Sequence, residues 1–200
     1  YPLRRQRQMC IRDSKNGERF VREDGRRDEM AKAMIAQPDG LVYYIFSCED
    51  PNEVYSLGKQ TLQYYLDNNL YGYMIDTSLE GLAEQMGVPA DTLAKTVEEF
   101  NAHTKAGDVD EFGRTSWAET IEGPYYVAYQ RKPAVHHTMG GVRIDTETHA
   151  LRADGSIIEG LYCAGEIVGG IHGGNRLGGN AIVDFCVFGR LAGTHAATDD

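Results

Sequence analysis

The chain has 200 residues, 42% of them hydrophobic and 25% charged, so it can bury the core of one domain or of two small ones. Its formal net charge of −10 argues against a nucleic-acid-binding surface or an acidic-membrane surface, although a local positive pocket can still hold an anion. No apolar run approaches the roughly 20 residues that a membrane helix needs, and we expect no membrane span in this chain. The sequence does not indicate a cellular location.

The first fourteen residues differ in composition from the rest of the chain. Residues 1–14 contain four arginines and one acid, whereas residues 15–200 contain 16 basic and 29 acidic side chains. A basic arm is one interpretation, and a start that is foreign to the folded unit is the other. We favour the second, and expect residues 1–14 to be disordered or to lie outside the fold.

Residues 15–133 show alternating helix and strand signals. A turn at Asn16-Gly17 precedes a helix that Pro38 ends, and the next segment is β-branched and aromatic, which is typical of a buried strand. Pro133 marks a domain boundary. The predicted elements are helices over 26–37, 59–69, 77–87 and 88–107, a strand over 41–47 and a strand after Pro124.

Two of these helices carry specific signals. Thr77-x-x-Glu80 predicts a capping box at the start of the first, and Gly87 can end it. The helix over 88–107 has apolar residues three or four positions apart, which predicts one buried face. These residues are Leu93, Val97 and Phe100. We interpret the acidic runs at 98–99 and 108–111 as solvated surface.

Beyond Pro133 the sequence changes to short strands and glycine loops. A strand is predicted over 141–145, and seven glycines fall between positions 165 and 179. Such a density of glycine predicts a backbone that lies close to another group. The apolar segment 180–193 then predicts a buried helix whose positive end points into the loop, which favours an anion or a carbonyl.

Other motifs exclude common site types. The sequence contains no G-x-G-x-x-G and no Walker loop, and its four cysteines lack the spacing of a zinc or haem site. We therefore expect isolated buried thiols and no metal site. His136 and His137 precede a Met-Gly-Gly step. Taken alone, this pair predicts a glycine turn with histidines on the surface or satisfied inside the fold.

Four motifs together carry a resemblance to a known family. They are "HHTMGG" (136–141), "GLYCAGE" (160–166), "GGIHGGNRLGGNA" (169–181) and "GERFVRED-x-x-RD" (17–28). In combination they resemble the fumarate reductase flavoprotein family, the soluble relatives of succinate dehydrogenase flavoprotein and flavocytochrome c. The similarity is collinear over about residues 15–200.

The resemblance implies an α/β protein with FAD as its cofactor. It implies part of an α+β clamp (capping) domain over 15–133, and the C-terminal segment of a Rossmann-like FAD-binding domain over 134–200. The family's N-terminal flavin-binding half is absent from the sequence, so we expect the chain to be a piece of a longer enzyme.

The resemblance also implies which residues contact the cofactor. Glu166 would hydrogen-bond the flavin ribityl chain, and the residues at 180–182 would face the pyrimidine edge of the ring, where a helix N-terminus stabilises developing negative charge. Read without the family, Glu166 is a strand-end carboxylate that caps the loop. The implied cofactor-binding set is Gly140, Gly165, Glu166, Asn180, Ala181 and Ile182.

A second group would bind the substrate. His137 resembles the family histidine that binds a substrate carboxylate, and Arg176 resembles the arginine that clamps it, with Gly179 beside them. A planar guanidinium suits a carboxylate, and an imidazole can add a hydrogen bond. His136 and His172 are left as loop or supporting groups.

Arg27 aligns with the family arginine that donates a proton to the substrate carbon. A guanidinium essentially never deprotonates in proteins, so a static clamp is the alternative role. Without the resemblance, "RRD" is a solvated charge run at a helix start, and Arg26 could be the operative arginine. The family's relay residues should lie about twenty positions earlier, where this sequence does not match.

The expected function is hydride transfer from flavin N5 to the C=C bond of an unsaturated carboxylate, with fumarate as the default substrate. An electron-donor protein or domain would be a further partner. Three alternatives remain open: another enoate reductase such as a urocanate reductase, a ketosteroid dehydrogenase, or a non-catalytic interaction module derived from the clamp.

Overall fold

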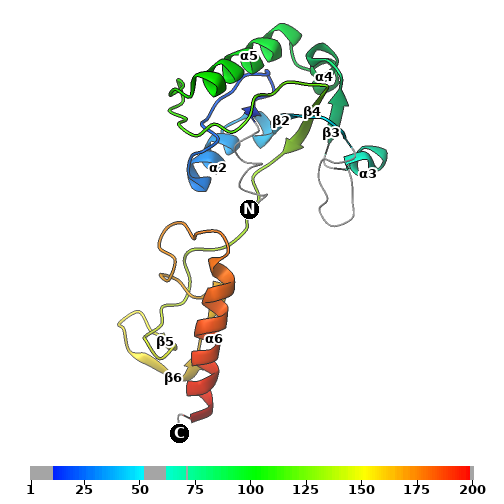
Figure 1. Cartoon of the computed structure of the whole chain (residues 1–200). Coiled ribbons are helices and arrows are strands. Elements are labelled where there is room, and N and C mark those ends of the chain that lie inside the picture. Colours follow the sequence, from blue (N-terminus) through cyan, green and yellow to red (C-terminus); the bar gives the residue numbers. More distant parts are fainter. Residues whose placement is uncertain (1–10, 52–61, 71, 199–200) are drawn as a thin grey trace. The chain divides into compact units, whose positions relative to one another are not determined.

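The computed structural model describes residues 11–51, 62–70 and 72–198. The chain divides into two compact units, which we call unit 1 (to Pro133) and unit 2 (from Ala134), so the division falls at the predicted boundary. Figure 1 shows a sheet with its helices in unit 1, and a hairpin beside a long helix in unit 2.

Unit 1 is built on a four-stranded antiparallel sheet with the order β1-β2-β4-β3. The predicted strand over 41–47 and the helices over 26–37, 77–87 and 88–107 are confirmed, while residues 59–61 of the other predicted helix lie outside the described residues. The elements are β1 (Ile11–Asp13), α2 (Arg27–Ile35), η1 (Pro38–Gly40), β2 (Val42–Cys48), α3 (Leu62–Asp67), β3 (Tyr73–Asp76), α4 (Leu79–Met86), α5 (Ala90–Ala106) and β4 (Tyr125–Arg131).

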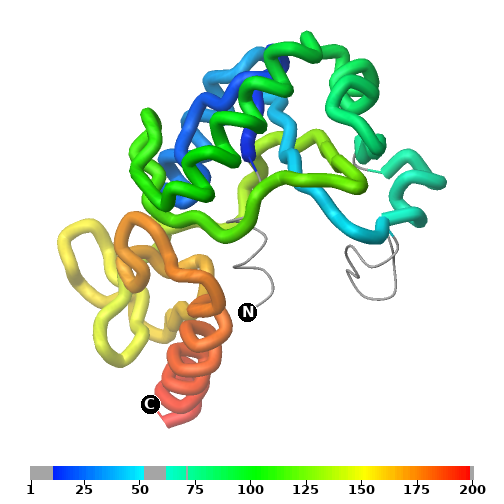
Figure 2. Tube along the Cα trace, turned by 45° about the horizontal axis from the view of Figure 1, so that its top comes forward, coloured from blue at the N-terminus to red at the C-terminus, as the bar shows by residue number. Residues whose placement is uncertain are grey.

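The sheet of unit 1 is covered on both faces. Because successive strand residues point to opposite faces, Tyr43 and Ile45 of β2 pack with α4 and α5, whereas Phe46 packs with Leu62 of α3. The larger core includes the predicted apolar face of α5, with Phe100 fully buried. The segment 14–25 runs alongside α5 (Figure 2), and Thr96 Oγ1 donates to the Gly17 carbonyl over 2.8 Å.

The cap of α4 lies one residue later than predicted. Ser78 rather than Thr77 is the N-cap, and its Oγ accepts a hydrogen bond from the Gly81 N–H over 3.0 Å. Asp76 accepts from both the N–H and the hydroxyl of Ser78, each over 2.9 Å, which holds this serine in the cap position. Gly87 ends the helix with φ +72°, as predicted.

The expectation for residues 1–14 is wrong for its last four residues. Ile11–Asp13 forms β1, which pairs with β2, and Ile11 is fully buried in the main core. The prediction was based on the arginine-rich composition of the segment and did not recognise Ile11 as a core residue. Residues 1–10 lie outside the described residues. Asp13 is buried too, both of its carboxylate oxygens lack a hydrogen-bond partner, and burial raises its pKa well above the ordinary value.

Unit 2 consists of an antiparallel hairpin, a glycine loop and one long helix. The predicted strand over 141–145 forms only isolated bridges, from Val142 to Val168 and from Ile144 to Ala150. The elements are β5 (His149–Leu151), β6 (Ile157–Tyr162), η2 (Gly165–Ile167) and α6 (Asn180–Thr198). Within the described ranges, no helix combines the length and apolar character needed to cross a bilayer.

The apolar helix α6 is not buried as predicted. Ile182, Val183 and Phe185 are 62%, 61% and 52% exposed, and Cys186, expected to be a buried thiol, is exposed as well. The buried residue of this helix is Asp184. Apolar side chains tend to be buried, which is why the sequence predicted a buried helix. The described residues of unit 2 leave these side chains of α6 exposed.

Candidate functional site

Two segments of unit 2 meet backbone to backbone and form the frame of the site. The Val142 N–H donates to the Ile167 carbonyl over 2.8 Å, and the Gly169 N–H donates to the Val142 carbonyl over 3.0 Å. A Cβ atom on Gly141 would overlap the Ile167 carbonyl oxygen, and one on Gly169 would lie 2.5 Å from the Gly141 nitrogen. Glycine at these two positions therefore permits the contact.

Most of the predicted glycine loop borders open space instead. A Cβ atom on Gly140 or Gly179, both predicted site residues, would meet no atom within 4 Å, whereas one on Gly165 would contact Phe185. We expected the backbone of the whole loop to lie close to another group. Within the described residues of this loop, Gly169 makes such a contact, with the backbone of Gly141 and Val142. The other open positions are Gly170, Gly173, Gly174 and Gly178.

Glu166 is exposed and braces this frame. Its Oε1 accepts a hydrogen bond from the Thr138 N–H over 2.9 Å, and the Thr138 hydroxyl donates to the Glu166 carbonyl over 3.3 Å. The Thr138 N–H holds the pKa of Glu166 below its usual range. The exposed carboxylate is thus ionised and can accept hydrogen bonds from the hydroxyl groups of a ligand.

His137 contacts His172, which in turn pairs with Asp184, and neither of these two residues was predicted to be a site residue. His172 packs edge-to-face on His137, with ring centroids 5.7 Å apart, and its Nε2 lies 2.9 Å from Asp184 Oδ2. Arg176 is only 4% exposed, and its backbone N–H lies 3.3 Å from the sulfur of Met139. A lone acid in an apolar helix was the signal that could have revealed Asp184.

The first turn of α6 adds positive potential to this group. Asn180, Ala181 and Ile182 begin the helix, and the Asn180 N–H donates to Leu177 over 3.3 Å. The N-terminus of a helix behaves as about half a positive charge. Together with the buried guanidinium of Arg176, it makes this end of unit 2 suited to an anion.

Arg27 lies in unit 1, at the first residue of α2. It is partly buried, whereas Arg26 is exposed and pairs with Asp28 over 3.1 Å. The interpretation of "RRD" as solvated charges therefore holds for Arg26, which is exposed, and only in part for Arg27. Arg176, the other arginine predicted to contact the substrate, belongs to unit 2.

The segment that leads to Arg27 is held by buried charges, which we call the Glu23 cluster (Arg19, Glu23, Asp110 and Arg114). Glu23 Oε2 accepts from Arg19 over 2.8 Å and from Arg114 over 2.7 Å, and Arg19 also reaches Asp110 over 2.7 Å. Arg114 is fully buried. The expectation that the acidic run 108–111 is solvated is therefore wrong for Asp110, which is 6% exposed.

Hydrogen bonds to backbone N–H groups also hold the segment 19–24 against the loop 110–116. Burial alone would raise the pKa of Asp110, but the Arg114 N–H and the Arg19 guanidinium hold it below its usual range. Asp24 accepts from the backbone N–H groups of Thr115 and Ser116 over 3.0 and 3.1 Å. The loop 110–116 thus fixes the segment 19–24, directly before α2.

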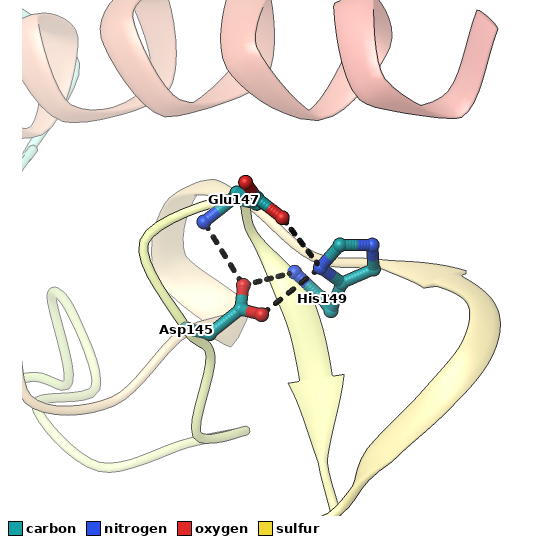
Figure 3. Close-up of side chains that lie close together, drawn as sticks. All are labelled: Asp145, Glu147 and His149. Carbon is teal, nitrogen blue, oxygen red and sulfur yellow. Dashed lines mark hydrogen bonds and ion pairs between the residues drawn. The ribbon is translucent and has the colours of Figure 1, made fainter. Parts of the chain in front are cut away.

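A compact trio of Asp145, Glu147 and His149 stands in the turn before β5 (Figure 3). Asp145 Oδ1 accepts from the backbone N–H groups of Glu147 and His149 over 3.0 and 2.9 Å, and Oδ2 lies 3.0 Å from His149 Nδ1. These contacts shape the turn, in which Thr148 has φ +73°. The acidic residue therefore stabilises a tight backbone conformation.

Comparison with known proteins shows the family to which the chain belongs. The family described as an FAD binding domain matches residues 3–182. The chain belongs to this family, as one of the fumarate reductase flavoproteins. FAD is therefore its cofactor, and the predicted α/β fold class is confirmed.

Individual relatives are longer than this chain. It is 41% identical over 185 residues to a probable fumarate reductase of Shewanella frigidimarina, covering 92% of this chain and 30% of the relative. It is 40% identical over 184 residues to an NADH:acrylate oxidoreductase of Vibrio harveyi, covering 92% and 18%. The open conformation of a flavocytochrome c3 fumarate reductase superimposes with a TM-score of 0.71 at 36% identity, covering 97% and 33%. The chain thus spans about a third or less of these relatives.

Proposed function

We propose that this chain serves an FAD-dependent reductase that adds a hydride and a proton across the C=C bond of a small unsaturated carboxylate, as in the conversion of fumarate to succinate. The observation that carries the proposal is the buried guanidinium of Arg176, in the loop that leads into the N-terminus of α6, together with the buried Nδ1 atom of His137, which lacks a hydrogen-bond partner among the described residues. Relatives named as fumarate reductase and acrylate oxidoreductase support it.

The carboxylate end of the substrate would bind in unit 2. Arg176 offers a planar pair of donors that matches a carboxylate, and its burial strengthens each charge-assisted hydrogen bond. His137 would donate a further bond, and its Nδ1 atom is buried without a hydrogen-bond partner in the described chain. Gly179, open on its side-chain face, leaves room for the ligand next to them.

The residues of the glycine loop fit a bound FAD, which would supply the hydride at its N5 atom. Glu166 would accept from ribityl hydroxyls, and the first turn of α6, Asn180–Ile182, would stabilise negative charge at the pyrimidine edge. Gly140 and Gly165 would line the approach. The open side-chain positions along the loop favour this fit, because a flat ring needs an unobstructed backbone surface.

Arg27 would provide the proton. The Glu23 cluster holds the segment before α2, so the side chain would be presented from a fixed helix start. Because a guanidinium binds its proton tightly, it would have to be reprotonated at once through another group. The electrons would come from a separate donor protein or domain.

Substitutions in unit 2 test the carboxylate assignment in a flavin-loaded protein that contains this chain. We expect Arg176→Ala to raise the KM for fumarate by roughly 10- to 150-fold, since a charge-assisted hydrogen bond contributes about 1.5 to 3 kcal/mol. His137→Ala should have a smaller effect in the same direction. Flavin content should persist in both variants, and exposed Arg143→Ala is the control.

Unchanged turnover of fumarate, acrylate and urocanate by both variants would refute the carboxylate clamp. Turnover of a 3-ketosteroid, with none of the three acids reduced, would instead support the steroid dehydrogenase alternative. A protein that binds no flavin would support the interaction module.

A further inference from the structure

We propose that Asp184 is a positioning residue for the carboxylate site and that it acts through His172. The proposal rests on the proposed function, because it assigns a role in presenting Arg176 and His137. It concerns one buried ionic contact that joins α6 to the glycine loop.

The contact is well shielded from solvent. Asp184 is 5% exposed, whereas its apolar neighbours Val183 and Phe185 on α6 are exposed. The carboxylate is therefore on the buried side of the helix, and these apolar side chains are on the exposed side. Its Oδ2 accepts from His172 Nε2 over 2.9 Å, and the two side chains are 3% and 12% exposed. A charge-assisted hydrogen bond in such surroundings is stronger than a surface ion pair.

His172 transmits this restraint in two directions. Its ring packs edge-to-face against His137, 5.7 Å between centroids, and so limits the orientation of that imidazole. Four residues later the same loop carries Arg176, whose N–H rests on Met139. Because the loop has many glycines, a side-chain anchor is needed to restrict its backbone. The Asp184–His172 pair supplies such an anchor.

A second Asp–His pair in unit 2 provides a matched control. Asp145 and His149 make a similar contact over 3.0 Å, but Asp145 also binds two N–H groups of its own turn. The side-chain hydrogen bonds of Asp145 run to Glu147 and His149 of its own turn. The same substitution at Asp145 therefore removes the same chemistry without disturbing the carboxylate site.

The test compares Asp184→Asn with Asp145→Asn in the flavin-loaded protein that contains this chain. We expect Asp184→Asn to raise the KM for fumarate and the dissociation constant of malonate by about tenfold, and to keep kcat within about threefold. Asp145→Asn should change neither constant. His172→Gln should reproduce the effect of Asp184→Asn, and it replaces that variant should the latter fail to fold.

Two further measurements separate positioning from general loss of structure. In the 200-residue chain, hydrogen exchange of the amides at 170–178 should quicken in Asp184→Asn and not in Asp145→Asn. In a double-mutant cycle, Asp184→Asn should add less to KM in the Arg176→Ala background than in the wild-type background, because part of its effect is to position Arg176.

The outcomes distinguish this proposal from the proposed function. A normal KM for Arg176→Ala would overturn the carboxylate assignment itself. A raised KM for Arg176→Ala together with unchanged constants for both Asp184→Asn and His172→Gln would overturn the positioning role alone. Fully additive effects in the cycle would also contradict it.

Discussion

Units 1 and 2 place polar and apolar groups in opposite ways. Unit 1 buries apolar side chains on both faces of its sheet, and it pairs the buried charges of the Glu23 cluster with one another. In unit 2, the apolar side chains of α6 are exposed and a carboxylate, Asp184, is buried. The first arrangement stabilises a fold, whereas the second leaves surface for binding.

The two units differ in the interactions that stabilise them. In unit 1, burial of apolar surface and paired charges stabilise the unit internally, and this stability holds the start of α2 and Arg27 in place. In unit 2, the backbone contact at Gly141 and Gly169 and the Asp184–His172 pair fix a small set of functional groups. Substitutions should therefore affect stability in unit 1 and ligand binding in unit 2.

A matched pair of phenylalanine truncations gives the largest expected contrast. Phe100→Ala removes a fully buried ring and should lower the free energy of unfolding by about 3–5 kcal/mol. Phe185 is 52% exposed, and Phe185→Ala should cost about 0.5 kcal/mol or less. Urea unfolding of the 200-residue chain, followed by circular dichroism, measures both. Equal losses would contradict the comparison.

The Glu23 cluster should respond nearly as strongly as the core. Glu23→Gln leaves the fully buried guanidinium of Arg114 without its carboxylate partner, which should cost about 3–5 kcal/mol. Trp117 is the single tryptophan of the chain and packs on Arg114, so its fluorescence reports this unfolding. Glu122→Gln, at the exposed pair with Lys105, should leave the midpoint unchanged. A mild effect at Glu23 would show that the cluster is solvated.

The smallest expected effect is a gain in stability, at a buried carboxylate of the unit 1 sheet that lacks hydrogen-bond partners. Asp13→Val should stabilise the chain at pH 7 by about 1–3 kcal/mol, because it removes a buried carboxylate without hydrogen-bond partners. The folded pKa of Asp13 lies above the unfolded value of about 3.9, so the wild-type chain loses stability as pH rises through the folded pKa. The gain should therefore shrink toward pH 4. A gain that grows on acidification would contradict this assignment.

Local patterns in the sequence were sufficient to predict most of unit 1. The spacing of Leu93, Val97 and Phe100 predicts the buried face of α5, and Pro133 coincides with the division between the units. The cap of α4 was missed by one residue because Asp76, outside the capping-box pattern, orders Ser78. Local sequence thus determines the elements, while neighbours adjust their ends.

Long-range pairing could not be predicted in the same way. Asp110 belongs to an acidic run and was expected in solvent, but its partner Arg19 is 91 residues away. His172 and Asp184 lie on a loop and a helix, and the pair exists only after both are folded. The family resemblance indicated Arg176 and His137, but it did not indicate what holds them.

We propose that Arg27 supplies the proton for the reduction and that Arg176 and His137 bind the substrate carboxylate. The most direct test is the effect of Arg27→Lys on kcat and KM of the flavin-loaded protein, with Arg26→Lys as the register control. We expect kcat for fumarate to fall by about 10² to 10⁴ with little change in KM, because a lysine ammonium does not present its proton where the guanidinium does, and a positioned proton donor contributes about this factor. A raised KM with kcat kept within about tenfold, or a larger loss of kcat at Arg26, would contradict the claim.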